Sequence, residues 1–245
     1  MKLFLKFNSI FLLSLITGWI TPVYAYKEVS VSNGGTISGT VVFKGRVPKR
    51  TIIPTRDKSV CGGMRKEPKI LVGKNKGVQE GIVYLKKVKK GKAWPVQQST
   101  PVLDQKNCRF APFVQIIRKG EFEILNSDPV LHNTHGYLCK KLGKQCKRTA
   151  FNVALPNQGQ IIKKKLKRAG TVKVDCEAHG WMLRWIQVLD NPYYAITGDD
   201  GTFTLSDVPP GKYTLVAFQG YTGGVEIPLT VKANQRLEIE AELKK

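Results

Sequence analysis

Short runs in which apolar and polar residues alternate recur along the chain, separated by turns rich in glycine and proline. A period of two is typical of strands that bury one face. No long apolar stripe at helical spacing and no internal repeat interrupts this pattern. It predicts an all-β protein built as a sandwich, with 113–117 and 122–125 forming a hairpin across Lys119 and Gly120. The clearest runs span residues 35–45, 81–85, 113–117, 122–125, 172–174 and 183–189.

The pattern changes after Asn191 and Pro192, where a second, smaller β unit is predicted. The Asp-Gly-x-Phe turn at 200–203 and the Pro-x-Gly-x-Tyr turn at 209–213 resemble those of carboxypeptidase regulatory-like, transthyretin-type β-sandwiches. Such domains begin with a strand that residues 35–41 resemble, so the resemblance implies a discontinuous domain. The expected division is a signal peptide at 1–25, an N-terminal β region at 26–95, a larger β domain at 96–190 and the regulatory-like unit at 191–245.

The N-terminus has the features of a secretory signal peptide. Lys2 and Lys6 precede an apolar run at 10–20, and Val-Tyr-Ala at 23–25 provides a small-residue cleavage pattern. This predicts cleavage after Ala25, export and a periplasmic location. The cleavage site has no cysteine for a lipid anchor, and no later run is long and apolar enough for a membrane span, so we expect no membrane insertion.

Basic residues dominate the earlier part of the chain. The formal net charge is +22, and removal of the signal peptide leaves +20, of which residues 190–245 contribute −3 and residues 26–189 about +23. This asymmetry predicts an acidic partner for the larger domain. Export separates the protein from nucleic acid, so we expect no partner of that class.

Five cysteines in an exported chain leave at least one unpaired. If Cys176 is a metal ligand, the other four can pair in three ways. We favour Cys139–Cys146, which closes a short loop, together with Cys61–Cys108, because an oxidising compartment allows both bonds. The alternative is that Cys176 is a buried, inert thiol.

A candidate metal site is visible in the spacing of Cys176, His179 and Met182, which lie at relative positions 0, 3 and 6. A second imidazole comes from His132 or His135. Two histidines, one cysteine and a weak axial methionine form the set that suits copper cycling between Cu(I) and Cu(II). Cysteine and histidine also suit zinc. Taken singly, Met182 is explained as core filler and His179 as a surface residue; their coincidence with Cys176 favours a ligand set.

These two segments resemble the ligand segments of a cupredoxin, or blue copper protein. Pro129-Val-Leu-His132-Asn133 matches the first, and Cys-x2-His-x2-Met has the short loop of the amicyanin type. The resemblance implies a cupredoxin-like Greek-key sandwich at 96–190 and one type 1 copper bound by His132, Cys176, His179 and Met182. It also implies that Asn133 ties the two ligand segments together. His135 is then structural or on the surface. A similar combination with a regulatory-like unit occurs in exported methylamine-utilisation-like proteins.

The leading functional hypothesis is a one-electron carrier rather than an enzyme, because three histidines are too few for a multicopper oxidase or nitrite reductase. Electrons would pass through the edge of His179, with Gly180 and Trp181 forming the docking surface. The partner would be an acidic periplasmic redox protein, such as a cytochrome or a dehydrogenase. Copper storage or delivery is one alternative, and a non-metal interaction module is another.

Overall fold

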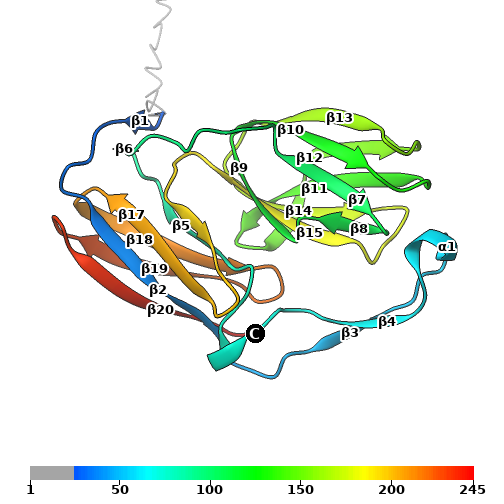
Figure 1. The fold of residues 1–245 in the computed structure, drawn as a ribbon, viewed down its shortest axis with the longest axis horizontal. Coiled ribbons are helices and arrows are strands. Elements are labelled where there is room, and N and C mark those ends of the chain that lie inside the picture. The colour runs from blue at the N-terminus through cyan, green and yellow to red at the C-terminus, as the bar shows by residue number, and fades with distance from the viewer. Residues whose placement is uncertain (1–24) are drawn as a thin grey trace, which may run out of the picture.

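Two β-sandwiches lie side by side in the computed structural model, which describes residues 25–245 (Figure 1). The predicted signal peptide, apart from Ala25, lies outside the described residues. We call the sandwich built from strands β7–β15 the central sandwich. The terminal sandwich consists of β2, β5 and β16–β20. Both have the all-β architecture that the sequence predicted.

The central sandwich packs a four-stranded sheet, in the order β13-β10-β7-β8, against a five-stranded sheet, in the order β12-β11-β14-β15-β9. The pairs β7–β10 and β9–β15 are parallel, and the other neighbours are antiparallel. Its strands are β7 Val102–Lys106, β8 Arg109–Ala111, β9 Val114–Arg118, β10 Gly120–Asn126, β11 His132–Lys141, β12 Lys144–Leu155, β13 Ile161–Leu166, β14 Gly170–Cys176 and β15 Leu183–Leu189.

The terminal sandwich combines strands from both ends of the described chain. One sheet has the order β16-β5-β18-β19 and the other β17-β2-β20, with β2 parallel to β20. Residues 26–95 therefore do not form a separate unit, and the central sandwich is inserted between β5 and β16. The strands are β2 Gly35–Phe43, β5 Ile82–Lys86, β16 Tyr194–Ile196, β17 Thr202–Val208, β18 Gly211–Gln219, β19 Gly223–Val231 and β20 Arg236–Leu243.

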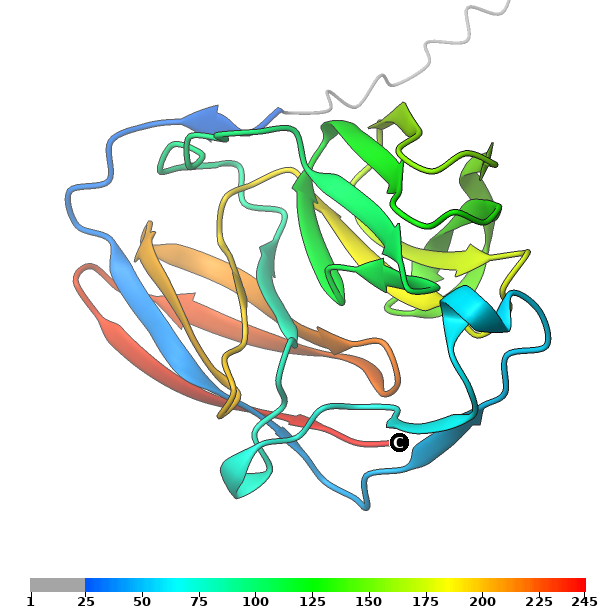
Figure 2. The same cartoon turned by 45° about the vertical axis from the view of Figure 1, so that its right-hand side comes forward.

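An arm, residues 44–69, leaves the terminal sandwich after β2 and reaches one end of the central sandwich (Figure 2). Its strands β3 Lys49–Ile52 and β4 Arg65–Pro68 pair only with each other, and α1 Lys58–Cys61 lies between them. Three further short elements are β1 Lys27–Glu28, β6 Lys90–Gly91, which pairs with β1, and the 3-10 helix η1 Lys74–Lys76. Within residues 25–245, no helix is long and apolar enough to cross a membrane.

The alternating sequence pattern explains the core of the central sandwich. In β10, Phe122 and Ile124 face inward and are fully buried, whereas Glu121 and Glu123, which alternate with them, face outward. Val174 in β14 meets them from the opposite sheet, in the same apolar cluster. Burial of these apolar side chains stabilises the fold, and it fixes which face of each strand points inward.

The predicted hairpin of residues 113–117 and 122–125 is wrong. Its strands exist as β9 and β10, but β9 pairs with β15 and β10 pairs with β7 and β13, so the two lie in opposite sheets. Ile117 and Phe122 are both buried in the shared core. The chain therefore crosses the sandwich between them, because apolar burial across two sheets outweighs a local ladder.

A separate apolar cluster joins the two sandwiches. Trp185 and Val114 of the central sandwich pack there with Tyr84 and Phe218 of the terminal sandwich. The Trp185 and Phe218 rings meet edge to face, with centroids 5.5 Å apart. This contact fixes the relative position of the two sandwiches.

Replacing Phe218 by alanine is expected to lower the free energy of unfolding by about 3–5 kcal/mol, because a fully buried aromatic ring leaves a cavity at the junction. Chemical denaturation followed by tryptophan fluorescence measures the change. Ile161→Ala serves as the control, because Ile161 is 54% exposed. Equal losses in the two variants would contradict a tight junction.

Candidate metal centre

His132 is the first residue of β11 and points into the central sandwich. Side chains alternate along this strand, so His132 and Thr134 are fully buried while Asn133 and His135 lie on the other face. His135 is three residues from His132 and therefore cannot share its direction. Its imidazole instead contacts Glu177, Thr149 and Tyr137 outside the core. Of the two candidate histidines, His132 is thus the one directed at Cys176.

The other ligand candidates lie on the loop that joins β14 to β15. Cys176 ends β14, and the backbone N–H of Met182 donates to the carbonyl of His179 at 2.9 Å, which closes a turn. The Glu177 N–H donates to the carbonyl of Asn133, tying this loop to β11. The loop therefore returns over the end of β14 and brings His179 back to Cys176.

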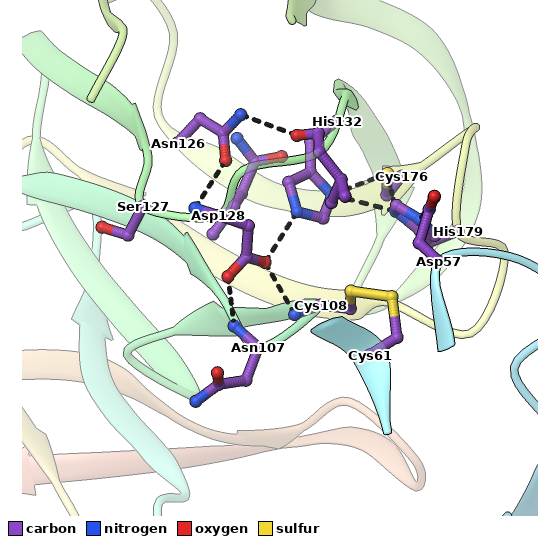
Figure 3. Close-up of polar contacts among 12 residues, drawn as sticks. Asp57, Cys61, Asn107, Cys108, Asn126, Ser127, Asp128, His132, Cys176 and His179 are labelled. Carbon is purple, nitrogen blue, oxygen red and sulfur yellow. Dashed lines mark hydrogen bonds and ion pairs between the residues drawn. A yellow bond between two sulfur atoms is a disulfide. The ribbon is translucent and has the colours of Figure 1, made fainter. Parts of the chain in front are cut away.

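Three donor atoms converge inside the sandwich (Figure 3). The Sγ atom of Cys176 lies 3.7 Å from Nδ1 of His132 and 3.8 Å from Nδ1 of His179, and the two Nδ1 atoms are 3.0 Å apart. Both histidines are fully buried and Cys176 is 1% exposed. One ion with bonds of about 2.0–2.3 Å spans such separations. The geometry therefore fits a single metal.

A carboxylate fixes the tautomer of each imidazole. Nε2 of His132 lies 2.9 Å from Oδ2 of Asp128, and Nε2 of His179 lies 2.9 Å from Oδ2 of Asp57. A carboxylate only accepts hydrogen bonds, so Nε2 carries the hydrogen in both rings. Both Nδ1 lone pairs then face the Cys176 sulfur. The pattern matches the carboxylate–histidine pairs that orient metal ligands in proteins.

This arrangement has too few hydrogens to satisfy its acceptors. The single thiol hydrogen can serve one Nδ1 atom, which leaves the second facing another lone pair at 3.0 Å. A cation between the three atoms removes this repulsion and gives each a partner. The donor set, two imidazoles and one thiol, suits copper or zinc. The residues present therefore fit the metal implied by the cupredoxin resemblance.

Burial sets the charge state of the site before a metal binds. It raises the pKa of the Cys176 thiol above its usual value, although hydrogen bonds from the backbone N–H groups of Asn133, His179 and Ala178 oppose the shift. Burial also lowers the pKa of His132, against the opposing effect of Asp128. Burial thus favours the neutral forms of the Cys176 thiol and the His132 imidazole, and metal binding must displace the thiol proton.

Met182 and Asn133 both lie next to Cys176, at the site where the sequence predicted them. Met182 is 2% exposed and packs in the same apolar cluster as Cys176, so its role as an axial ligand stays a prediction. The tie between the ligand segments is made by the backbone of Asn133. Its side-chain Oδ1 is buried without a hydrogen-bond partner among the described residues.

The predicted docking surface is altered by the arm. The edge of His179 does not face solvent, because Asp57 covers its Nε2 atom. Gly180 is exposed, whereas Trp181 is half-buried. Two hydrogen bonds hold Trp181 in place: its indole N–H donates to the carbonyl of Cys108, and its own carbonyl accepts from Arg50. An exposed edge of His179 is therefore wrong, whereas the docking role of Gly180 and Trp181 stays a prediction.

Both predicted disulfides are present. Cys61–Cys108 joins the arm to the central sandwich, and Cys139–Cys146 links β11 to β12. Cys176 is the free, buried thiol. The cysteine left available for a metal is therefore Cys176, the one that the ligand spacing predicted.

Asp57 and Asp128 were missed by sequence reasoning. Asp128 lies in the turn just before His132, and its carboxylate also accepts from the backbone N–H groups of Asn107 and Cys108, at 2.7 and 2.8 Å. Its proximity to His132 was a usable signal. Asp57 is 122 residues from His179 in sequence and belongs to a different part of the fold, so no local pattern could reveal it.

The chain matches no family model and no curated protein. Solved structures that align with part of it include a purple cupredoxin from Nitrosopumilus maritimus, at 20% identity over 37% of this chain and 100% of that one, with a TM-score of 0.31. Amicyanin from Paracoccus versutus aligns at 13% identity over 45% of this chain and 99% of that one, with a TM-score of 0.31.

A Cu-containing nitrite reductase from Thermus scotoductus SA-01 aligns at 16% identity, with a TM-score of 0.31. The alignment covers 40% of this chain and 24% of the reductase. These alignments cover less than half of this chain. The case for a metal centre therefore rests on the geometry of the candidate site itself.

Asp128→Asn is expected to weaken copper binding by about 10–100-fold, because the amide cannot accept the His132 hydrogen and both backbone hydrogen bonds as the carboxylate does. Competition titration with a copper chelator measures the affinity. Asp104→Asn is the control, since Asp104 accepts from Ser127 and does not contact His132 in the described part of the chain. Circular dichroism of both variants checks folding, and equal affinities would contradict the role of Asp128.

Proposed function

We propose that this protein is a periplasmic type 1 copper protein that carries single electrons. The observation that carries the proposal is the convergence of Cys176, His132 and His179 in a buried space, with both Nδ1 atoms directed at the thiol. Copper in such a set supplies the one-electron step between Cu(II) and Cu(I). Met182 would complete the set as a weak axial ligand.

The protein's own residues favour fast electron exchange by holding the ligands still. His132 is fixed by Asp128, His179 by Asp57, and Cys176 by the end of β14. Ligands restrained in this way keep nearly one geometry in both oxidation states, so little reorganisation accompanies the transfer. The sandwich also excludes water from the donors, all of which are buried. These features support a carrier in preference to an enzyme, which would need open space for a substrate.

Copper storage or delivery uses the same ligands and remains the competing proposal. It is less well supported, because delivery requires the ion to leave. Here each histidine is clamped by a carboxylate and the donors are buried. Export to the periplasm agrees with the two disulfides, which form in oxidising compartments.

The acidic redox partner, a cytochrome or dehydrogenase, would be attracted by the basic charge of the chain. One basic region, formed by the exposed Lys141, Lys144 and their neighbours, lies at the far end of β11 from His132. The arm is a second basic region, with nine basic and two acidic residues in 44–69. Because Asp57 contacts His179, we propose that the partner docks on the arm side.

Titration of the purified protein with Cu(II) is expected to produce an intense visible band from thiolate-to-copper charge transfer. The band should bleach on reduction and be missing in Cys176→Ser, because serine cannot supply the thiolate. Absorption spectroscopy measures both. Colourless but tight copper binding would favour storage or delivery, and no copper binding at all would overturn the metal assignment.

Reduction of the Cu(II) protein by ferrocyanide is expected to slow as ionic strength rises, because salt screens the attraction between this anion and the basic surface. Arg56→Glu should slow the reaction more than Lys141→Glu. Both variants change the charge equally, but Arg56 adjoins Asp57 while Lys141 lies at the far end of β11. Stopped-flow absorbance gives the rates; equal slowing would argue against docking on the arm side.

A further inference from the structure

The arm covers the ligand loop without belonging to the sheets of either sandwich. β3 and β4 pair only with each other, and α1 at their tip lies over the end of the central sandwich where the ligands converge (Figure 2). A hairpin of this size has little stability by itself. Its position therefore depends on contacts with the sandwiches on either side.

One disulfide and three polar contacts join the arm to the ligand end of the central sandwich, where Val60 of the arm also packs against the core. Cys61 is bonded to Cys108, and Asp57 contacts His179. Arg50 donates to the carbonyl of Trp181 at 3.1 Å, and Glu67 forms an ion pair with Arg109 at 2.9 Å. Only the disulfide is covalent. The ion pair is partly exposed, with Arg109 half in solvent, so its contribution is small.

The disulfide controls where Asp57 lies. Asp57 has a left-handed backbone, with φ 50°, which a non-glycine residue adopts at a cost in free energy. Its carbonyl accepts from the N–H groups of Val60 and Cys61, so a single turn connects it to the bonded sulfur. Figure 3 shows the Asp57 carboxylate beside His179 and the disulfide close to the same ring. A sulfur of the pair and the His179 ring nitrogen lie within 4.8 Å.

We propose that the arm is a disulfide-locked cover over the copper site, in which Asp57 is a positioning residue for His179. The proposal rests on the copper site described above. With the Cys61–Cys108 bond formed, Asp57 holds the Nε2 hydrogen of His179 and closes the edge of the ring to solvent. With the bond broken, the remaining contacts, which are polar apart from the packing of the partly buried Val60, are too weak to keep the cover closed.

The lock opens by ordinary thiol–disulfide exchange. An external dithiol supplies two electrons and two protons; the Sγ–Sγ bond breaks, Cys61 and Cys108 become thiols, and the dithiol is oxidised to its own disulfide. The ligand thiol of Cys176 takes no part in this step. Opening exposes His179 and makes the copper easier to remove.

The test compares the Cys61→Ser/Cys108→Ser double variant with wild type and with Cys139→Ser/Cys146→Ser, which removes a disulfide that does not touch the ligands. Loss of the copper–thiolate band in the presence of excess chelator gives the release rate. The first variant is expected to release copper about 10–100-fold faster than the control, because His179 loses its support. Equal rates in the two variants would overturn the lock.

Asp57→Asn tests the positioning role separately. It is expected to shift the reduction potential and the copper–thiolate band, because the amide no longer accepts the His179 hydrogen as a carboxylate does. Asp207→Asn is the matched control: Asp207 also has a left-handed backbone, with φ 57°, but lies in the terminal sandwich. An unchanged potential and band in Asp57→Asn would overturn this role.

A copper-free measurement separates this proposal from the proposed function. Carbethoxylation of His179 in the apoprotein, followed by mass spectrometry, should be slow in wild type and fast in Cys61→Ser/Cys108→Ser. If wild type forms no copper–thiolate band, the copper function fails, but this measurement still decides whether the arm covers the histidine. Equally fast modification in wild type would overturn the cover.

Discussion

Each of the two buried imidazoles gives its Nε2 hydrogen to a carboxylate, and this leaves two lone pairs and one thiol facing a common point. Such a cluster is unfavourable without a cation, because buried acceptors need partners. The surrounding structure maintains it nonetheless. The central sandwich supplies His132 and Cys176, and the β14–β15 loop supplies His179. One carboxylate comes from the turn just before His132 and the other from the arm. Maintaining this cluster in the empty protein costs free energy that a bound cation would recover.

The two sandwiches contribute unequally to this site. All the metal-ligand candidates come from the central sandwich, whereas Asp57 comes from the arm that grows out of β2 in the terminal sandwich. The junction formed by Trp185 and Phe218 fixes the two sandwiches, and the arm then spans a set distance to His179. The terminal sandwich is therefore connected to the metal centre through one segment, and not by its own sheets.

Much of the fold and of the donor set could be predicted from the sequence. The alternation of residues located β2 closely, because a half-buried strand leaves a period of two, and the predicted run at 183–189 coincides with β15. The spacing of Cys176, His179 and Met182 was informative because one loop presents all three. The choice of His132 over His135 relied on a following asparagine, and the structure shows that strand alternation is the physical reason.

What the sequence could not reveal are contacts between distant segments. The Phe113–Leu125 region has the local pattern of a hairpin. Its two strands nevertheless join opposite sheets, β9 beside β15 and β10 beside β7, because their apolar side chains are buried between the sheets. Asp57 looks like an exposed polar residue in a lysine- and proline-rich connection. Its role depends on a disulfide and a left-handed turn that bring it over His179.

The parallel pairing of β2 with β20 has a consequence for how the chain acquires its structure. Ser38 and Glu238, hydrogen-bonded across this pair, are 200 residues apart, so closing the ladder requires the loss of much chain entropy. The contacts of the central sandwich span much shorter separations and can form while β2 is still unpaired. We expect the scaffold of the candidate metal site to fold early and the terminal sandwich to assemble last, when β2 pairs with β20.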